Sequence, residues 1–273
     1  MTTASASSAP SDGGRWLARV EDAGINASAP REQRWVDGWL VRFSPGTAKR
    51  ARCIQPVAPG RLPVEEKLAL CLPIFAGAGL QPYVRITPFA QPAALDRTLA
   101  ALGMAALDQT WVMTNATLDA FAAEDASEHS RARGAARIEP VGAATFAEWL
   151  GAARGSAPAE RDAHAARISQ APVPHHAVLL RDADGALVCG GQVAIEEPLA
   201  GLYDVFTVEA ARGRGHAERI CRHLLGRARR LGATIGYLQV DAGNEAARRI
   251  YRRLGFGDAY PYHYRTPAQA PTD

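Results

Sequence analysis

The chain has 273 residues, of which 47% are apolar and 22% are charged, and its formal net charge is +3. This length exceeds one typical domain of about 100–150 residues, so two compact units are expected. The small net charge and the lack of a basic arm argue against a nucleic-acid partner, and no apolar stretch is long enough to cross a membrane. Composition therefore predicts a globular protein that binds no nucleic acid and does not span a membrane.

The chain's start and its cysteines favour a cytoplasmic location. Residues 1–14 are rich in Ser, Ala and Thr and lack a basic start followed by an apolar core, which is typical of a disordered tail and not of a secretion signal. The adjacent His175 and His176 have no second cluster at ligand spacing, so no metal site is expected. The cysteines form no CxxC pair and are expected to be free thiols in a reducing compartment: Cys53, Cys71, Cys189 and Cys221.

The first half, residues 15–121, is predicted as an α+β unit. Its predicted elements, in chain order, are strands at 39–43 and 48–57 around a Ser-Pro-Gly turn, a helix at 64–76 that Pro73 should end early, a strand at 83–88, a helix at 93–102 and a strand at 111–114. Residues 122–136 are alanine-rich and charged, and we interpret them as a linker. This half lacks any glycine turn of the kind described below. It is either a degenerate copy of the second half or an unrelated α+β domain, and in both cases we expect it to wall a substrate cleft.

The second half, residues 137–273, has a clearer pattern. Its predicted elements are a strand at 137–140, helices at 145–150 and 158–170, strands at 176–180, 186–196 and 202–208, a helix at 215–231, a strand at 235–240, a helix at 244–254 and an aromatic strand at 260–265. The Asp-Ala-Asp-Gly turn at 182–185 lies between apolar runs and predicts a hairpin.

A glycine turn follows the strand at 202–208 and opens the next helix. Gly213 and Gly215 let the backbone approach a ligand closely, and the helix presents free N–H groups and its positive dipole end to an anion. Arg212 and Arg214 add positive charge at the same place. This order of elements is typical of a pyrophosphate site.

Two motifs in this half resemble the signatures of the GNAT superfamily of acyl-CoA-dependent N-acyltransferases. The spacing Arg212-x-x-Gly215-x-Ala217 resembles the first signature. The run Asn-x-x-Ala-x-x-x-Tyr-x-x-x-Gly-Phe, which starts at Asn244, is similar to the second. The resemblance covers residues from about 137 onward and implies an α+β fold with a mixed sheet. If the first half is a degenerate copy, the chain is a tandem pair of such units.

The resemblance implies transfer of an acetyl group from acetyl-CoA to an amine, carried by a small molecule or by a protein, by direct attack through a tetrahedral intermediate. A backbone N–H group near Phe206 to Val208 would polarise the thioester carbonyl, while Asn244 would also cap its helix. The resemblance further implies that acetyl-CoA lies against the strand, the turn and the second signature, at Phe206, Thr207, Val208, Arg212, Gly213, Arg214, Gly215, His216, Ala217, Glu218 and Asn244.

Two residues are predicted to be catalytic. Tyr251 falls on the position that often serves as the general acid in the family, and a phenol is a ready proton donor at neutral pH; the alternative is a tyrosine packed under the sheet. Asp204 is the first choice for the general base, because its charge in an otherwise apolar strand needs a reason; the alternative is a hydrogen-bonded structural carboxylate. Glu196 and Glu197 are weaker candidates for the base, since a solvated turn before Pro198 is favoured.

Two other functions stay open. One is a non-catalytic acyl-CoA sensor or scaffold. The other is a Rossmann-type dinucleotide enzyme, because Gly213-x-Gly215 opens a helix and Asp241 ends the next strand; Glu218 at the third glycine position argues against it. The chain is expected to be a monomer or a homodimer.

Overall fold

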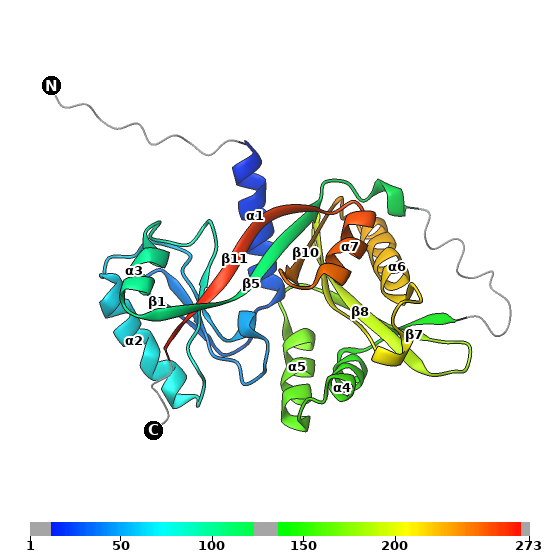
Figure 1. Ribbon diagram of the computed structural model, residues 1–273, viewed down its shortest axis with the longest axis horizontal. Helices are drawn as coiled ribbons and strands as arrows, with labels where there is room; N and C mark the ends of the chain where they lie inside the picture. The colour runs from blue at the N-terminus through cyan, green and yellow to red at the C-terminus, as the bar shows by residue number, and fades with distance from the viewer. Residues whose placement is uncertain (1–11, 123–135, 269–273) are drawn as a thin grey trace.

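The computed structural model describes residues 12–122 and 136–268, with the side chains of residues 12–14 left aside. These residues form one 11-stranded mixed sheet in the order β1-β2-β3-β4-β11-β5-β10-β9-β8-β7-β6. Figure 1 shows most of the first half of the chain at one end of the molecule and most of the second half at the other. The α+β class predicted from the sequence is confirmed.

The first half differs from the prediction in several places. Helix α1 begins at Asp12, inside the predicted tail. Helix α2 does not end early but continues through Pro73. Pro73 has no N–H to donate to the carbonyl four residues earlier, but both residues are exposed, so water can take the place of the missing donor. The predicted strand at 48–57 is wrong, because most of it is a loop with a short 3-10 turn. The elements are α1 (Asp12–Ala27), β1 (Gln33–Val36), β2 (Trp39–Arg42), η1 (Lys49–Ala51), β3 (Ile54–Gln55), α2 (Val64–Gly77), β4 (Val84–Ile86), α3 (Leu95–Ala101), β5 (Met104–Asn115) and η2 (Asp119–Phe121).

The second half agrees with the prediction to within a few residues at most element ends. The hairpin between β7 and β8 is confirmed, with Gly185 at φ 88° in its turn. The elements are β6 (Arg137–Val141), α4 (Ala143–Arg154), α5 (Pro158–Gln170), β7 (His175–Arg181), β8 (Leu187–Glu196), β9 (Leu199–Thr207), η4 (Glu209–Ala211), α6 (His216–Arg230), β10 (Ile235–Asp241), α7 (Glu245–Arg253) and β11 (Gly257–Pro267).

The two halves repeat one strand order. In the first, β1, β2 and β3 are antiparallel, and α2 leads to β4, which is parallel to β3. In the second, β7, β8 and β9 are antiparallel, and α6 leads to β10, which is parallel to β9. A helix and one more strand then follow in each half, α3 with β5 and α7 with β11. This repetition favours the degenerate tandem copy over an unrelated domain.

Each half contributes a strand to the sheet of the other. β11 lies between β4 and β5, and β5 lies between β11 and β10, all in antiparallel pairs. Figure 1 shows β11 and β5 side by side at the centre of the molecule. The predicted linker at 122–136 lies outside the described residues apart from its two ends. The strands before and after it belong to the same sheet, so the described residues do not form two separate sheets.

The sheet is covered on both faces in the second half. Tyr237 and Leu238, neighbours on β10, point to opposite faces and belong to different core clusters. The cluster around Leu238 includes Leu224 of α6, whereas the cluster around Tyr237 includes Val20 of α1. All four cysteines are buried and free, as predicted.

Candidate active site

The turn between β9 and α6 carries a row of unpaired main-chain donors. Gly213 and Gly215 have φ angles of 77° and 78°, and a Cβ at either position would meet nothing within 4 Å. Among the described residues, none accepts a hydrogen bond from the N–H groups of residues 213–218, and α6 has no side-chain cap. Six successive amides at the positive end of a helix can bind an anionic group such as a pyrophosphate.

The charges around this turn also favour an anion. Arg212 and Arg214 are exposed beside it. The carboxylate of Glu218, which could repel a phosphate, is paired with Arg253 at 2.9 Å and with Arg222 at 3.5 Å. The local charge is therefore positive even though an acidic residue lies in the first turn of α6.

Strands β9 and β10 separate just before this turn. They pair only from Leu199 to Leu202, although β9 continues to Thr207. Beyond Leu202, β9 pairs with β8 on one side, and no described strand pairs with its other edge. Such an edge can bind an extended ligand through its main-chain groups. Phe206 and Thr207 lie on it; the N–H of Val208, however, already donates to the Val188 carbonyl at 2.9 Å, so it cannot polarise a thioester.

A bulge in β9 turns Asp204 away from the regular strand. The register with β8 shifts between Tyr203 and Phe206, and Asp204 has a φ of 51°. A bulge re-aims the side chain it carries. As a result the Asp204 carboxylate lines a cavity of about 280 Å³.

Three side chains hold the Asp204 carboxylate. Gln192 donates to it at 2.8 Å, and the Arg154 guanidinium donates at 3.2 Å. His164 Nε2 lies 3.2 Å from Oδ2, near enough for an ion pair but not aligned for a hydrogen bond. Burial raises the pKa of Asp204, but His164, Arg154 and the more distant Arg167 outweigh it and hold that pKa well below its usual range. Asp204 thus stays ionised at neutral pH and is a weak base, which favours the predicted structural carboxylate.

Both halves of the chain line the cavity. The loop at 46–50 comes from the first half, whereas α4, α5 and Asp204 come from the second. A smaller adjoining cavity of about 50 Å³ shares Arg50, His164, Arg167 and Asp204 with it. The first half therefore forms one wall of this cavity; that the cavity binds a substrate stays a prediction.

The ring of Tyr251 is packed, but its hydroxyl is left without a partner. Its half-buried ring packs against Phe256, with centroids 6.3 Å apart, and against the core beneath α6. Its hydroxyl makes no hydrogen bond with any described residue and keeps some access to solvent. Burial, reinforced by the nearby Cys221 and Cys189, raises the pKa of Tyr251 above its ordinary value. The phenol is therefore a protonated donor without an internal acceptor.

Other predicted residues have simpler surroundings. Asn244 caps α7 by accepting the Ala247 N–H at 3.1 Å, as expected; its contact with a cofactor stays a prediction. Glu196 binds Arg19 at 3.2 Å and Asn26 at 3.0 Å, both on α1. Neither Glu196 nor Glu197 lines the cavity that contains Asp204.

Sequence reasoning missed the residues that surround Asp204, because they come from distant segments. They are Arg50, Arg154, His164, Arg167 and Gln192. One signal was available: Arg161, His164 and Arg167 recur at intervals of three along α5, which places them on one helical side.

The first half has a loop at the position of the glycine turn, between β3 and α2, but two of its main-chain donors are occupied. The Asp37 carboxylate accepts the N–H groups of Arg61, at 2.8 and 2.9 Å, and of Leu62, at 2.8 Å. The fully buried Lys67 ammonium lies 3.4 Å from the same carboxylate. This internal anion takes the place that a phosphate would need.

The hairpins of β7, β8 and β9 and the mostly antiparallel sheet do not fit a Rossmann fold, which is built from parallel crossovers. Within residues 12–122 and 136–268, no group of three His, Cys, Asp or Glu side chains is arranged to hold a metal ion. No helix in these ranges is both long and apolar enough to span a bilayer.

Comparison with known proteins agrees with this architecture. The chain is 25% identical over 236 residues to an uncharacterized N-acetyltransferase, YobR, of Bacillus subtilis, covering 85% of this chain and 91% of that protein. Its fold is similar to a GCN5-related N-acetyltransferase from Kribbella flavida, with a TM-score of 0.62, 19% identity and coverage of 93% and 96% of the two chains. A tandem GNAT protein from the clavulanic acid biosynthesis pathway has a TM-score of 0.59 and 14% identity, with 96% of each chain covered.

The family model for the C-terminal part of Rv0428c, described as a probable histone acetyltransferase, matches residues 17–265. That range includes both halves of the sheet and the whole of the candidate site. The chain therefore belongs to this acetyltransferase family, within the GNAT superfamily.

Proposed function

We propose that the protein transfers an acetyl group from acetyl-CoA to a primary amine by direct attack. The observation that carries this proposal is the succession of two features: the unpaired edge of β9 leads, through the short 3-10 turn η4, to the unpaired amides of residues 213–218. A ligand with an extended arm and a pyrophosphate matches both.

Different residues would bind different parts of acetyl-CoA. The amides of residues 213–218 would hold the pyrophosphate, with Arg212 and Arg214 beside them, and the free edge of β9 would hold the pantetheine arm. When bound, acetyl-CoA supplies an activated acyl group. Main-chain groups of Phe206 and Thr207 would orient its carbonyl close to the cavity that contains Asp204.

Tyr251 would donate the proton that the leaving thiolate requires. Its hydroxyl has no acceptor among the described residues, and its raised pKa keeps it protonated at neutral pH. A sensor that only bound acyl-CoA would have no need for such a donor, so this free phenol favours turnover over a purely binding role.

The amine's proton would leave through the pair formed by Asp204 and His164. Asp204 is too weak a base to take it, because its pKa is held well below the usual range. Imidazole is the commonest general base in enzymes, and a carboxylate beside it orients the ring. Asp204 would attract the ammonium form of the acceptor, and the neutral form of His164, whose Nε2 lies 3.2 Å from that carboxylate, would accept the proton.

Two measurements test the proposal. Acetyl-CoA and CoA, but not NAD, should raise the melting temperature, since a ligand at 100 times its dissociation constant stabilises by about 2.7 kcal/mol. Thiol release in the presence of a panel of primary amines should then exceed the release without amine. Failure of both CoA compounds to shift the melting temperature would remove the cofactor assignment, and binding without thiol release would leave the sensor.

A further inference from the structure

The cavity beside Asp204 is rich in positive charge. Its lining contains more basic than acidic side chains: Lys49, Arg50, Arg154, Arg161 and Arg167 against Glu160 and Asp204. A buried cation is costly unless a carboxylate or another anion accompanies it. A cation that has no carboxylate partner within the protein is therefore available to bind an anionic ligand.

Three of the five cations are paired within the protein: Lys49 with Asp108, Arg161 with Glu148 at 2.6 Å, and Arg154 with Asp204 at 3.2 Å. Glu160 is also occupied, because its carboxylate accepts the Ala157 N–H at 3.0 Å at the start of α5. Only Arg50 and Arg167 remain without a carboxylate.

Arg167, on α5, is half-buried and makes no hydrogen bond or ion pair with any described residue. The pKa of Arg167 is lowered, mainly by burial. The negative charge of Asp204 raises that pKa and the positive charge of Arg50 lowers it further, and the lowering effects are larger. A guanidinium in this position carries five N–H donors that the folded chain leaves available.

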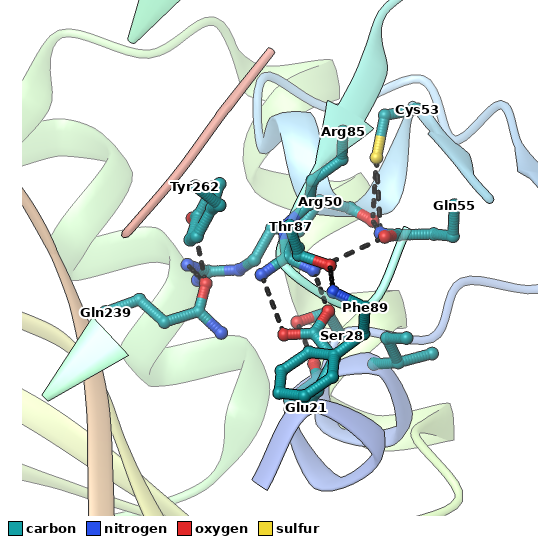
Figure 2. Close-up of polar contacts among 12 residues, drawn as sticks. Glu21, Ser28, Arg50, Cys53, Gln55, Arg85, Thr87, Phe89, Gln239 and Tyr262 are labelled. Atoms are coloured by element: carbon teal, nitrogen blue, oxygen red, sulfur yellow. Dashed lines mark hydrogen bonds and ion pairs between the residues drawn. The ribbon is translucent and has the colours of Figure 1, made fainter. Parts of the chain in front are cut away.

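Arg50, from the 3-10 turn of the first half, has only neutral partners. Its Nη1 donates to the Gln239 amide oxygen at 2.7 Å, and its guanidinium lies 5.4 Å from the centroid of the Tyr203 ring. Figure 2 shows Arg50 beside Gln239, whose oxygen also accepts the Tyr262 hydroxyl at 2.9 Å. These contacts fix the orientation of Arg50 without neutralising its charge.

Arg50 and Arg167 line both adjoining cavities, together with Asp204. Two guanidiniums that lack a carboxylate favour a carboxylate or phosphate, which each can bind through parallel N–H groups. We propose that the acyl acceptor is a small amine that also carries an anionic group, and that Arg50 and Arg167 bind this group. The inference rests on the proposed acetyl transfer and narrows its acceptor.

The opposite charges in the cavity suit such a molecule. Asp204 attracts the ammonium end, while the two arginines bind the acidic end. An acceptor that carries only positive charge, such as a lysine-rich peptide, would meet the same two arginines without a partner for either.

The test compares matched amine pairs that differ only in the acidic group: alanine with alaninamide, and phosphoethanolamine with ethanolamine. In the wild type, kcat/KM for acetylation should be at least about tenfold higher for the acidic member of a pair. Hydrogen bonds to charged groups contribute about 1.5–3 kcal/mol, so Arg167→Gln should reduce this preference about 10- to 100-fold. Which pair shows the preference distinguishes a carboxylate from a phosphate.

Arg161→Gln is the matched control, because Arg161 lines the same cavity but is paired with Glu148; it should keep the preference. The dissociation constant for acetyl-CoA should be the same in all three proteins. Protection against heat by the acidic amines, present in the wild type and absent in Arg167→Gln, gives a readout independent of turnover.

Several outcomes would overturn the inference: equal use of both members of each pair, a better rate with a lysine-rich peptide, loss of acetyl-CoA affinity in Arg167→Gln, or neither acetylation nor thermal protection by any acidic amine. Acetylation without discrimination would leave the proposed acetyl transfer intact. Failure to bind acetyl-CoA would instead refute that function itself.

Discussion

His164 Nε2 lies 3.2 Å from Oδ2 of Asp204, and this contact joins α5 to the bulge of β9. It exists because the bulge turns the carboxylate out of the strand and toward α5. The same carboxylate receives Arg154 from α4 and Gln192 from β8. The Asp204 carboxylate therefore lines the cavity and connects α4, α5 and β8 to the bulge of β9.

The first prediction concerns the stability that Asp204 provides. The pKa of Asp204 in the folded chain lies well below the unfolded value of about 3.9. The ionised carboxylate therefore stabilises the fold fully at pH values above the unfolded pKa. This stabilisation is lost as the pH falls from about 4 toward the folded pKa. Asp204→Asn should lower the free energy of unfolding by about 1–3 kcal/mol between pH 5 and 8. Urea unfolding at several pH values measures this.

The difference between wild type and Asp204→Asn should shrink below pH 4. Asparagine tolerates the positive φ of this position, so backbone strain should contribute little. Asp184→Asn, in an exposed turn, serves as the control and should change stability little at any pH. A difference that stayed constant down to pH 3 would contradict the role of ionisation.

The second prediction concerns Tyr251. Tyr251→Phe should reduce kcat about 100-fold, the low end for loss of a general acid, while the dissociation constant of acetyl-CoA stays unchanged. Because burial raises the pKa of Tyr251, wild-type activity should show no loss from its ionisation up to about pH 10. Tyr83→Phe, which removes a hydroxyl bonded to Gln81, is the control; equal turnover in wild type and Tyr251→Phe would exclude the acid role.

The third prediction concerns the glycine turn. Gly215→Val should weaken acetyl-CoA binding, measured by calorimetry, because a branched side chain blocks the approach of a phosphate to the backbone. Gly185→Val is matched to it: both glycines have a positive φ and open space around a Cβ. The two variants should lose comparable stability, and only Gly215→Val should lose affinity. Equal affinity in both would place the pyrophosphate elsewhere.

The fourth prediction concerns stoichiometry. Because the carboxylate of Asp37 occupies the loop donors of Arg61 and Leu62 in the first half, calorimetry should find one acetyl-CoA per chain. Asp37→Asn should lower the melting temperature, since the buried Lys67 loses its counter-charge, and should leave the stoichiometry at one. Two equivalent sites in the wild type would mean that both halves bind cofactor.

Local pattern explains why much of the second half was predicted. The Asp-Gly turn, the alternation of strands and helices and the two signatures depend on residues close together in sequence, so the hairpin of β7 and β8, the turn at Gly213 and Gly215 and the cap at Asn244 were found. The 3-10 turn at Lys49–Ala51 was mistaken for a strand, because a loop held by tertiary contacts need not show loop composition.

The sequence by itself determined the family, the glycine turn at Gly213 and Gly215 and the candidate acid, because each depends on residues a few positions apart. Only the tertiary structure decided the exchange of β5 and β11 between the halves, the surroundings that make Asp204 a weak base, and the convergence of Arg50 and Arg167. Residues 50 and 167 are far apart in the chain, and their proximity follows from the packing of both halves on one sheet, which no local periodicity encodes.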